Sequence, residues 1–423
     1  MVKHEACEEK NERDFPRDWE IKPLAELADV VMGQSPLGST YNKSGDGIAL
    51  INGPTEFTKR YPVKKQWTNQ PTKLCQKGDL LICVRGSSTG RLNFSNDEYC
   101  IGRGVAAIRG KNVYIEYIAN QLQLEMGKLL NLTVGSTFPN IDGSTIKSIP
   151  ILIPKMLDEQ KAIVQALFDT EQLICSMEKL IEKKCLIKQG AMQDLLKPKT
   201  GWLTYSLDDL FIFNGGYTAT REKLSDEGYC YLHYGDIHGS KKAFIDVGKE
   251  YTYIPKLMVD IKKISSKVLL SDGDVVFVDA SEDDDGTSRH VVIKNSEQVP
   301  FIAGLHTIVA KSKTNLLDNG YRQYCFQSNE VKFQFKFYAV GTKVSGVSKT
   351  NIGKITVTIP AKIDEQKYIA EILSDMDSEI SVLENKLSKY RQIKQGMMQE
   401  LLTGRIRLYE RGATGKGNTR SNH

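Results

Sequence analysis

A long internal repeat constrains the fold of this chain more than any other feature. Residues Ile153–Leu196 align without a gap with Ile359–Leu402, a shift of 206 residues, and 20 of the 44 positions are identical. Both copies contain Ile-Pro, Asp-Glu-Gln-Lys, Ile-Lys-Gln-Gly and Met-Gln-x-Leu-Leu. One copy lies mid-chain and the other near the C-terminus, so we expect two similar halves that each end in the same element.

Hydrophobic periodicity predicts that this element is a long helix. The first copy places polar residues at Thr170, Lys184 and Lys188 of the seam, whereas the second is more regular. The seam of the second copy consists of Ile369, Leu373, Met376, Ile380, Leu383, Leu387, Tyr390, Lys394, Met397 and Leu401. A helix of roughly 40 residues is about 60 Å long, more than a compact domain needs. We therefore expect an antiparallel coiled coil of the two helices; packing of each helix on its own domain is the alternative.

The rest of the two halves also corresponds. Trp19 and Trp202 open the halves, and strand-like runs follow at Leu80–Val84 and Val275–Val278. The shift between matching positions grows from 183 to 206, so the second half carries 23 extra residues, which we expect in surface loops. Short β-rich runs come first and one helical stretch comes late, which is typical of α+β domains. We expect a mobile leader (1–17), a globular domain (18–154), a long helix (155–197), a second globular domain (198–360), a second long helix (361–403) and a tail (404–423).

Composition narrows the class of protein. The chain has 57 basic and 52 acidic residues, and this small excess permits nucleic acid as a partner without requiring it. Eight cysteines are scattered without a Cys-x-x-Cys spacing, and the sequence has no apolar leader and no apolar run of membrane length. We therefore expect a cytoplasmic protein with reduced thiols, no structural zinc and no membrane segment.

Two basic segments of the first half are candidates for contact with nucleic acid. Arg85 to Arg91 places two guanidinium groups around a loop of glycines and hydroxyls, which suits a phosphate or a base edge. A solvated hairpin is the alternative for this loop. Upstream, Lys59, Arg60 and Lys64 alternate with aromatic residues, a mixture compatible with a backbone groove or with an ordinary soluble face.

The matching loop of the second half, Asp279 to His290, has the opposite chemistry. Its acidic run before Gly286 does not fit a calcium loop, because the twelfth position would be Val292 where a carboxylate is needed. Acidic residues can accept from cytosine, and Arg289 and His290 remain available to phosphate, although a surface turn explains the run equally well. The two halves therefore carry unlike loops on similar scaffolds.

No catalytic motif is found in the sequence. It has no Walker loop, no aromatic-ended Asn-Pro-Pro or Asp-Pro-Pro segment and no glycine run that opens a helix; Gly102-Arg103-Gly104 leads into a strand-like run. The six histidines never have metal-ligand spacing, and His233 with His238 is better explained by loop or core positions. We expect no enzyme activity and no metal site in this chain.

The order of these features resembles a specificity subunit of a type I restriction-modification system over roughly Trp19 to Leu408. The resemblance is carried by the tryptophan-led starts, the Gly-Asp strand approaches at Gly78 and Gly273, the Val-Gly-Ser/Thr segments, and the Ile-Pro and Asp-Glu-Gln motifs before each long helix. It implies two target-recognition domains that each read one part of a split, asymmetric DNA site, and two helices that set the gap. A coiled-coil scaffold whose globular halves bind protein is the alternative function.

The resemblance also implies the partners. They are double-stranded DNA, two methylation subunits and, through the assembled complex, restriction and translocation subunits; S-adenosylmethionine, ATP and Mg are expected on these subunits and not on this chain. Loop position and chemistry select the DNA-contact candidates Ser35, Tyr41, Lys59, Arg60, Lys64, Arg85, Ser87, Thr89, Arg91, Tyr217, Lys241, Lys242, Arg289, His290, Lys343 and Lys349. The partner-contact candidates are Asp158, Glu159, Gln160, Asp364, Glu365 and Gln366.

Overall fold

The computed structural model describes residues 15–132, 140–240, 242–281, 288–341 and 345–408. Its contacts divide the chain into two units. Unit 1 extends to Glu178 and resumes at Lys386, and unit 2 comprises Lys179–Asn385. The two long helices, α4 (Leu157–Leu195) and α11 (Ile363–Leu402), therefore contribute residues to both units.

The globular part of unit 1 contains eleven of the described strands, three α-helices and a 3-10 turn at Gly38–Thr40. The strands are β1 (Trp19–Pro23), β2 (Ala28–Met32), β3 (Tyr41–Asn42), β4 (Ile48–Ile51), β5 (Trp67–Thr68), β6 (Leu74–Cys75), β7 (Leu80–Cys83), β8 (Leu92–Phe94), β9 (Tyr99–Ile101), β10 (Val105–Gly110) and β11 (Pro150–Pro154). The helices are α1 (Leu24–Leu27), α2 (Ile115–Leu132) and α3 (Gly143–Ser148). They form a β1-β11 ribbon, a β2-β10-β7-β8 sheet and a β3-β5-β4-β9-β6 sheet.

The globular part of unit 2 repeats this plan with additions. Its strands are β12 (Trp202–Ser206), β13 (Phe211–Gly215), β14 (Leu224–Ser225), β15 (Tyr229–Leu232), β16 (Phe244–Asp246), β17 (Lys256–Leu257), β18 (Val275–Val278), β19 (Ala280–Ser281), β20 (His290–Lys294), β21 (Phe301–Ala303), β22 (Thr307–Ser312), β23 (Ser345–Gly346) and β24 (Thr356–Pro360). Its helices are α5 (Leu207–Leu210), α6 (Tyr234–Gly239), α7 (Val247–Glu250), α8 (Arg322–Cys325), α9 (Asn329–Tyr338) and α10 (Lys349–Lys354).

The sheets of the two units correspond strand for strand where the sequence repeat predicts it. The β12-β24 ribbon matches β1-β11, and β13-β22-β18-β20 matches β2-β10-β7-β8. The β14-β17-β15-β21 sheet matches β3-β5-β4-β9 of unit 1, and an isolated bridge between Leu269 and Ile302 stands where β6 pairs with β9. The extra strand β16 pairs with β20 at the sheet edge, so part of the additional length of the second half forms an edge strand, not only surface loop.

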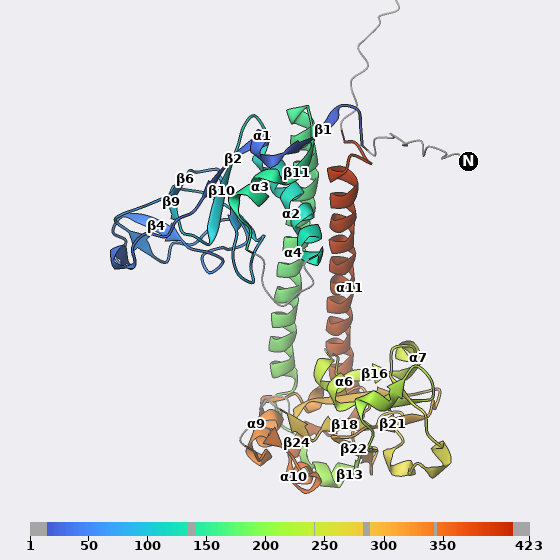
Figure 1. Cartoon of the computed structure of the whole chain (residues 1–423). Helices are drawn as coiled ribbons and strands as arrows, with labels where there is room; N and C mark the ends of the chain where they lie inside the picture. The colour runs from blue at the N-terminus through green and yellow to red at the C-terminus, as the bar shows by residue number, and fades with distance from the viewer. Residues whose placement is uncertain (1–14, 133–139, 241, 282–287, 342–344, 409–423) are drawn as a thin grey trace, which may run out of the picture. The chain divides into compact units, whose positions relative to one another are not determined.

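The long helices pack on each other within each unit and run antiparallel there (Figure 1). In unit 1, Ile163 and Leu167 of α4 share a core with Leu401 and Leu402 of α11 and with Trp19 of the globular domain. In unit 2, Met192 and Leu195 of α4 pack against the core that contains Ile369 and Leu373 of α11. Each predicted seam position of both helices is buried or half-buried, which confirms the expected packing. Each helix end also joins a globular core. The long helices therefore pack both on each other and on the globular domains.

Gly404 terminates α11, whose last residue is Leu402. Its φ of +73° is the left-handed conformation that terminates many helices, and a Cβ here would lie 2.6 Å from Cδ of Pro16. Both the backbone conformation and the space therefore require glycine at this position. None of the described helices combines the length and the apolar character needed to cross a membrane.

Candidate nucleic-acid interface

In unit 1, four loops meet at one end of the sheets. Strands β4 and β9 are parallel neighbours, so the loops after Ile51 and Ile101 leave from the same edge. The Gly33 N–H donates to the Val105 carbonyl at 2.9 Å, which adds the loop after β2. The Val84 N–H donates to the Gly104 carbonyl at 2.9 Å and adds the loop after β7. We call this region the loop end of unit 1.

Unit 2 builds the same loop end with the same bonds. The parallel pair is β15 and β21, and the Gly304 N–H donates to the Leu232 carbonyl at 2.9 Å. The Tyr217 N–H donates to the Ala303 carbonyl at 2.7 Å, and the Asp279 N–H donates to the His306 carbonyl at 3.2 Å. The loops after β13, β15, β18 and β21 therefore converge in unit 2.

One glycine in each unit allows these loops to approach so closely. A Cβ on Gly33 would lie 2.2 Å from the Gly102 carbonyl oxygen, and one on Gly216 would lie 1.7 Å from the Gly304 oxygen. Both distances are far inside van der Waals contact, so any side chain would push the loops apart. The duplicated glycines show that close backbone approach is part of the shared scaffold.

Side chains with spare hydrogen-bonding capacity are exposed at the loop end of unit 1. Arg85 and Ser87 are exposed, and within the described part of the chain neither side chain has a hydrogen bond or ion pair. Ser35 Oγ accepts from the Arg103 N–H at 3.2 Å, which places the exposed Arg103 beside the Ser35 loop. Arg103 was missed by the sequence reasoning, although its flanking glycines were a usable signal. Arg85, Ser87, Ser35 and Arg103 thus form a cationic surface whose side chains can donate hydrogen bonds.

Two other predicted contacts of the same loop have internal roles. The Arg91 guanidinium donates to the carbonyls of Pro54 at 3.3 Å and Phe57 at 2.9 Å, so it holds the loop that follows β4. Thr89 is 6% exposed, and its hydroxyl donates to the Gly86 carbonyl at 2.7 Å. Tyr41, nearby, donates its hydroxyl to the Pro36 carbonyl at 3.2 Å. These three side chains shape the loops.

The basic segment Lys59–Lys64 faces other partners. Lys59 Nζ lies 3.4 Å from Glu178 Oε2 of α4. The Arg60 guanidinium lies 5.5 Å from the ring centroid of Phe168, also on α4. Lys64 Nζ lies 2.8 Å from Asp97, and this ion pair raises the pKa of Lys64 and lowers that of Asp97. The positive charges of Lys59, Arg60 and Lys64 are thus at least partly paired within unit 1.

The loop end of unit 2 carries a different set of side chains. Arg289 is exposed and donates through Nη1 to the His238 carbonyl. His306 Nδ1 lies 3.2 Å from Asp279 Oδ1, and its φ of +58° is rare for a residue with a side chain. Tyr234 packs edge-on to His306 with centroids 5.4 Å apart. Such backbone outliers gather at functional sites, so His306 joins Arg289 as a candidate contact.

His290 occupies the core and not the surface. It is 6% exposed, and its ring lies 5.2 Å from Phe326 and 5.6 Å from Phe277. Burial lowers the pKa of His290 to about 4, so the ring is neutral near pH 7. A neutral buried imidazole offers no charge to a phosphate. The sequence placed His290 in a polar loop, whereas in the structure it is the first residue of the buried strand β20.

The remaining candidates of unit 2 are placed as follows. Tyr217 is half-buried, and its carbonyl accepts from the Tyr231 hydroxyl at 2.8 Å. Lys242 Nζ lies 3.5 Å from Glu250. Lys349 is exposed at the start of α10 and lies beside Gly215. Lys241 and Lys343 lie outside the described residues.

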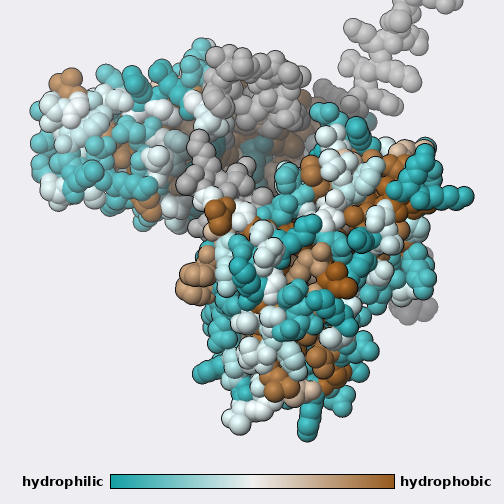
Figure 2. Space-filling view, turned by 90° about the horizontal axis from the view of Figure 1, so that it is seen from below, coloured by the Kyte–Doolittle hydropathy of each residue, from teal (hydrophilic) through white to brown (hydrophobic). Residues whose placement is uncertain are grey.

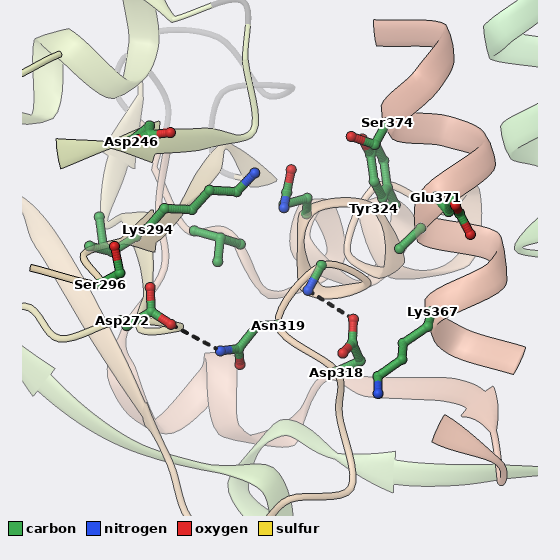
Figure 3. Close-up of a pocket in the computed structure, with 15 residues that line it drawn as sticks. Asp246, Asp272, Lys294, Ser296, Asp318, Asn319, Tyr324, Lys367, Glu371 and Ser374 are labelled. Carbon is green, nitrogen blue, oxygen red and sulfur yellow. Dashed lines mark hydrogen bonds between the residues drawn. The ribbon is translucent and has the colours of Figure 1, made fainter. Parts of the chain in front are cut away.

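A cavity of about 560 Å³ in unit 2 is lined by residues of β16, β20, α8 and α11 (Figure 3). Asp272, before β18, contributes to it, whereas the loop end begins at Asp279 after the same strand. The charged side chains that line the cavity are Asp246, Asp272, Asp318, Glu371, Lys294 and Lys367. Four carboxylates against two ammonium groups disfavour phosphate here. Over the described residues, no three histidine, cysteine or acidic side chains are grouped to hold a metal ion.

The Asp-Glu-Gln motifs begin both long helices, and their glutamines are internal. Gln160 is buried; it accepts from the Tyr114 N–H at 2.9 Å and donates to the Pro154 carbonyl at 2.9 Å. Gln366 repeats this arrangement with the Asp318 N–H at 2.8 Å and the Pro360 carbonyl at 2.9 Å. The motif therefore joins each long helix to its globular domain.

The acidic residues of the motifs differ in exposure. Glu159 is buried, and Glu365 accepts from Trp202 Nε1 at 3.1 Å. Asp158 and Asp364 are exposed in the first turn of each helix. Figure 2 shows that hydrophilic residues predominate on the face it presents, with hydrophobic residues in small groups.

Comparison with known proteins gives a consistent result. The family described as "Type I restriction modification DNA specificity domain" matches residues 16–184 and 199–392. The chain is 23% identical over 430 residues to the type I restriction enzyme MjaVIII specificity subunit of Methanocaldococcus jannaschii, covering 96% of this chain and 97% of that protein. It is 33% identical to a protein named for the MjaX specificity subunit of the same organism, but that match spans only 47% of each chain.

Solved structures share the fold. The crystal structure of a type I restriction-modification S subunit from M. genitalium superposes with a TM-score of 0.55 at 15% identity, covering 93% of this chain and 97% of that one. A chain from a study of complex assembly and conformational transition of the type I system gives 0.60 at 12% identity, covering 93% and 99%. At these identities the likeness concerns the fold alone.

Proposed function

Because the chain belongs to the family of type I restriction-modification DNA specificity proteins, we propose that it is the non-catalytic subunit that selects the DNA sequence for a methylation and restriction complex. Each loop end reads one part of a split site, and the two long helices set the gap between the parts. Since the two loop ends differ in chemistry, the site is asymmetric.

The observation that carries this proposal is the duplicated loop end with unlike side chains. Equivalent backbone bonds form both loop ends, but unit 1 presents Arg85 and Arg103 whereas unit 2 presents Arg289, Asp279 and His306. A shared scaffold with exchanged surface residues is suited to two readers of different sequences. Arginine binds guanine bidentately in the major groove, and carboxylates accept from cytosine.

The proposed DNA contacts are a subset of the sequence candidates with two additions. Arg85, Ser87, Ser35 and Arg103 serve unit 1, and Arg289, His306, Tyr217 and Lys349 serve unit 2. Arg91, Thr89 and Tyr41 support the loops that carry the contacts. His290 is left out because its ring lies in the core.

The partners in this proposal follow the family. Two methylation subunits bind at the two helix starts, where Asp158 and Asp364 are exposed and Gln160 and Gln366 orient the helix ends. These subunits supply S-adenosylmethionine chemistry, and restriction subunits that join the complex supply ATP- and Mg-dependent steps. The complex acts on double-stranded DNA in the cytoplasm.

Mapping of methylated bases tests the proposal. The chain is assembled with its methylation subunit, plasmid DNA is treated with S-adenosylmethionine, and modified positions are read by direct sequencing. We expect one split motif with two unlike parts and a fixed gap. Modification without sequence preference, or a single contiguous motif, would contradict the proposal.

The alternative, a scaffold whose globular halves bind protein, makes a different prediction. Such a scaffold leaves the DNA affinity of the methylation subunit unchanged. Under the proposed function, adding the chain produces retention on duplex DNA that falls as salt rises, because phosphate contacts release counterions.

A further inference from the structure

A salt bridge between the long helices occurs twice, with the helices exchanged. In unit 1, Glu171 Oε2 of α4 lies 2.6 Å from Lys394 Nζ of α11. In unit 2, Asp377 Oδ1 of α11 lies 2.5 Å from Lys188 Nζ of α4. Adding the repeat shift of 206 to 171 and 188 gives 377 and 394, so the same two repeat positions form both pairs. The lysines that interrupt the apolar seam thus have partners across it.

In unit 2 this pair also holds the globular domain. Asp377 Oδ2 accepts from the Tyr324 hydroxyl at 3.0 Å, and Lys188 Nζ lies 5.8 Å from the Tyr324 ring centroid. Tyr324 belongs to α8 and is 2% exposed. It lines the cavity of Figure 3 together with Ser374 of α11. One carboxylate therefore joins α4, α11 and the globular domain.

In unit 1 cations attach the globular domain to α4 on both sides of Glu171, at Phe168 and at Glu178. Glu178 Oε1 lies 2.7 Å from Arg391 Nη2 of α11, and its Oε2 lies 3.4 Å from Lys59 Nζ. The Lys59 pair is weak because that side chain is 82% exposed. Arg60 is the stronger attachment, since its guanidinium lies 5.5 Å from the centroid of Phe168 and 5.4 Å from that of Phe94.

We propose that the Tyr324–Asp377 contact in unit 2 and the Arg60–Phe168 contact in unit 1 fix the pose of each globular domain on the helix pair, and so determine which gap length the protein accepts. This inference rests on the proposed function and deepens it. Arg60 is then a positioning residue and not a DNA contact. Base pairs are about 3.4 Å apart along the duplex, so a loop end that shifts by that distance accepts a gap one base pair longer or shorter.

Two substitutions test the inference with matched controls. Tyr324→Phe removes only the hydroxyl that binds Asp377, and Tyr253→Phe is its control on a side chain that is 87% exposed. Arg60→Gln removes the guanidinium on Phe168. Lys64→Gln is its control because Lys64 belongs to the same basic segment as Arg60 but pairs with Asp97 of the globular domain and not with a long helix.

The assay is a competition among DNA gap lengths. The chain, assembled with its methylation subunit, is offered duplexes with the wild-type half-sites and gaps that vary by up to two base pairs in each direction. We expect the wild type and both controls to prefer one gap. In Tyr324→Phe and in Arg60→Gln, the preference for the wild-type gap over the other gaps should fall about tenfold. The half-site bases that are selected and the salt dependence of binding should stay unchanged. Thermal unfolding verifies that each variant is folded.

Three outcomes would count against the inference, each in a distinct way. An unchanged gap preference in both variants overturns it while the proposed function stands. Uniform weakening of Arg60→Gln on every gap, with a smaller salt slope, identifies Arg60 as a phosphate contact and overturns its positioning role. A wild-type complex that selects no sequence overturns the proposed function itself.

Discussion

Arg407 binds the buried carboxylate of Glu159 through two contacts, of 2.5 Å from Nε and 2.8 Å from Nη2. The same guanidinium donates to both oxygens of Asp18 at 3.0 Å. These bonds raise the pKa of Arg407 and tie the segment after α11 to the residue before β1 and to the first turn of α4. The carboxylate of Glu159 is 1% exposed, so it depends on this partner.

Arg407→Ala should destabilise unit 1 by about 3 to 5 kcal/mol, because it leaves the Glu159 carboxylate buried without a countercharge. Denaturant unfolding of the two proteins measures the difference. Arg405→Ala is the control, since Arg405 is 66% exposed and lies 3.5 Å from Glu400, and it should cost no more than about 1 kcal/mol. Equal effects of the two substitutions would show that Arg407 does not stabilise Glu159.

Arg85→Ala should relax base selection in one half-site only, by about 1 to 3 kcal/mol, if the guanidinium reads a base. Binding is measured on duplexes that differ at single positions of each half-site. Lys77→Ala is the control, because Lys77 is exposed at the opposite end of β7 and should leave selection unchanged. Equal weakening on every sequence would instead identify Arg85 as a phosphate contact.

Gln366→Ala should destabilise unit 2 by about 3 kcal/mol or more. The substitution leaves the Asp318 N–H and the carbonyls of Leu316 and Pro360 without their partner in a fully buried position. Gln395→Ala, on the exposed face of the same helix, should lie within about 0.5 kcal/mol of the wild type. Chemical unfolding followed by circular dichroism compares the three proteins; a neutral Gln366 variant would refute the role given to the motif.

His290 should make the protein less stable as the pH falls from about 6.5 to about 4. Burial lowers the pKa of the folded state from 6.5 to about 4, so the unfolded chain binds a proton more readily in this window. Stability is therefore fully present above the unfolded pKa and declines by up to about 3 kcal/mol below it. The free energy of unfolding is measured at pH 7 and pH 5 for the wild type and His290→Gln. Carboxylates affect both proteins alike, so a smaller decline in the variant isolates His290, and identical declines would disprove its part.

The long helices were predictable because their signal is local and repeated. The apolar spacing and the terminating Gly404 are properties of the sequence alone, and the structure follows both. The lysines in the seam were not explained by that pattern. Their partners, Asp377 for Lys188 and Glu171 for Lys394, are identified only when the register between the helices is known.

The loop side chains show where sequence reasoning stops. Arg60, Arg85 and Arg91 have the same chemistry, but tertiary contacts direct Arg60 to Phe168 and Arg91 to two carbonyls, whereas Arg85 has no partner among the residues that the structure describes. The approach of Arg103 to Ser35 depends on the antiparallel pairing of β2 and β10. Long-range strand pairing has no local signature, so these assignments required the fold.

The discontinuity of unit 1 has a consequence for the order of folding during synthesis. Gln121 of α2 donates to the Leu402 carbonyl at 2.7 Å, and Leu401 and Leu402 belong to the same core as Trp19. Domains generally fold as they leave the ribosome, from the N-terminus onward. Here the half that is translated first lacks part of its core until nearly the whole chain has been made. Unit 2 can be completed earlier, and the exposed apolar face of unit 1 makes the nascent chain most prone to aggregate in that interval.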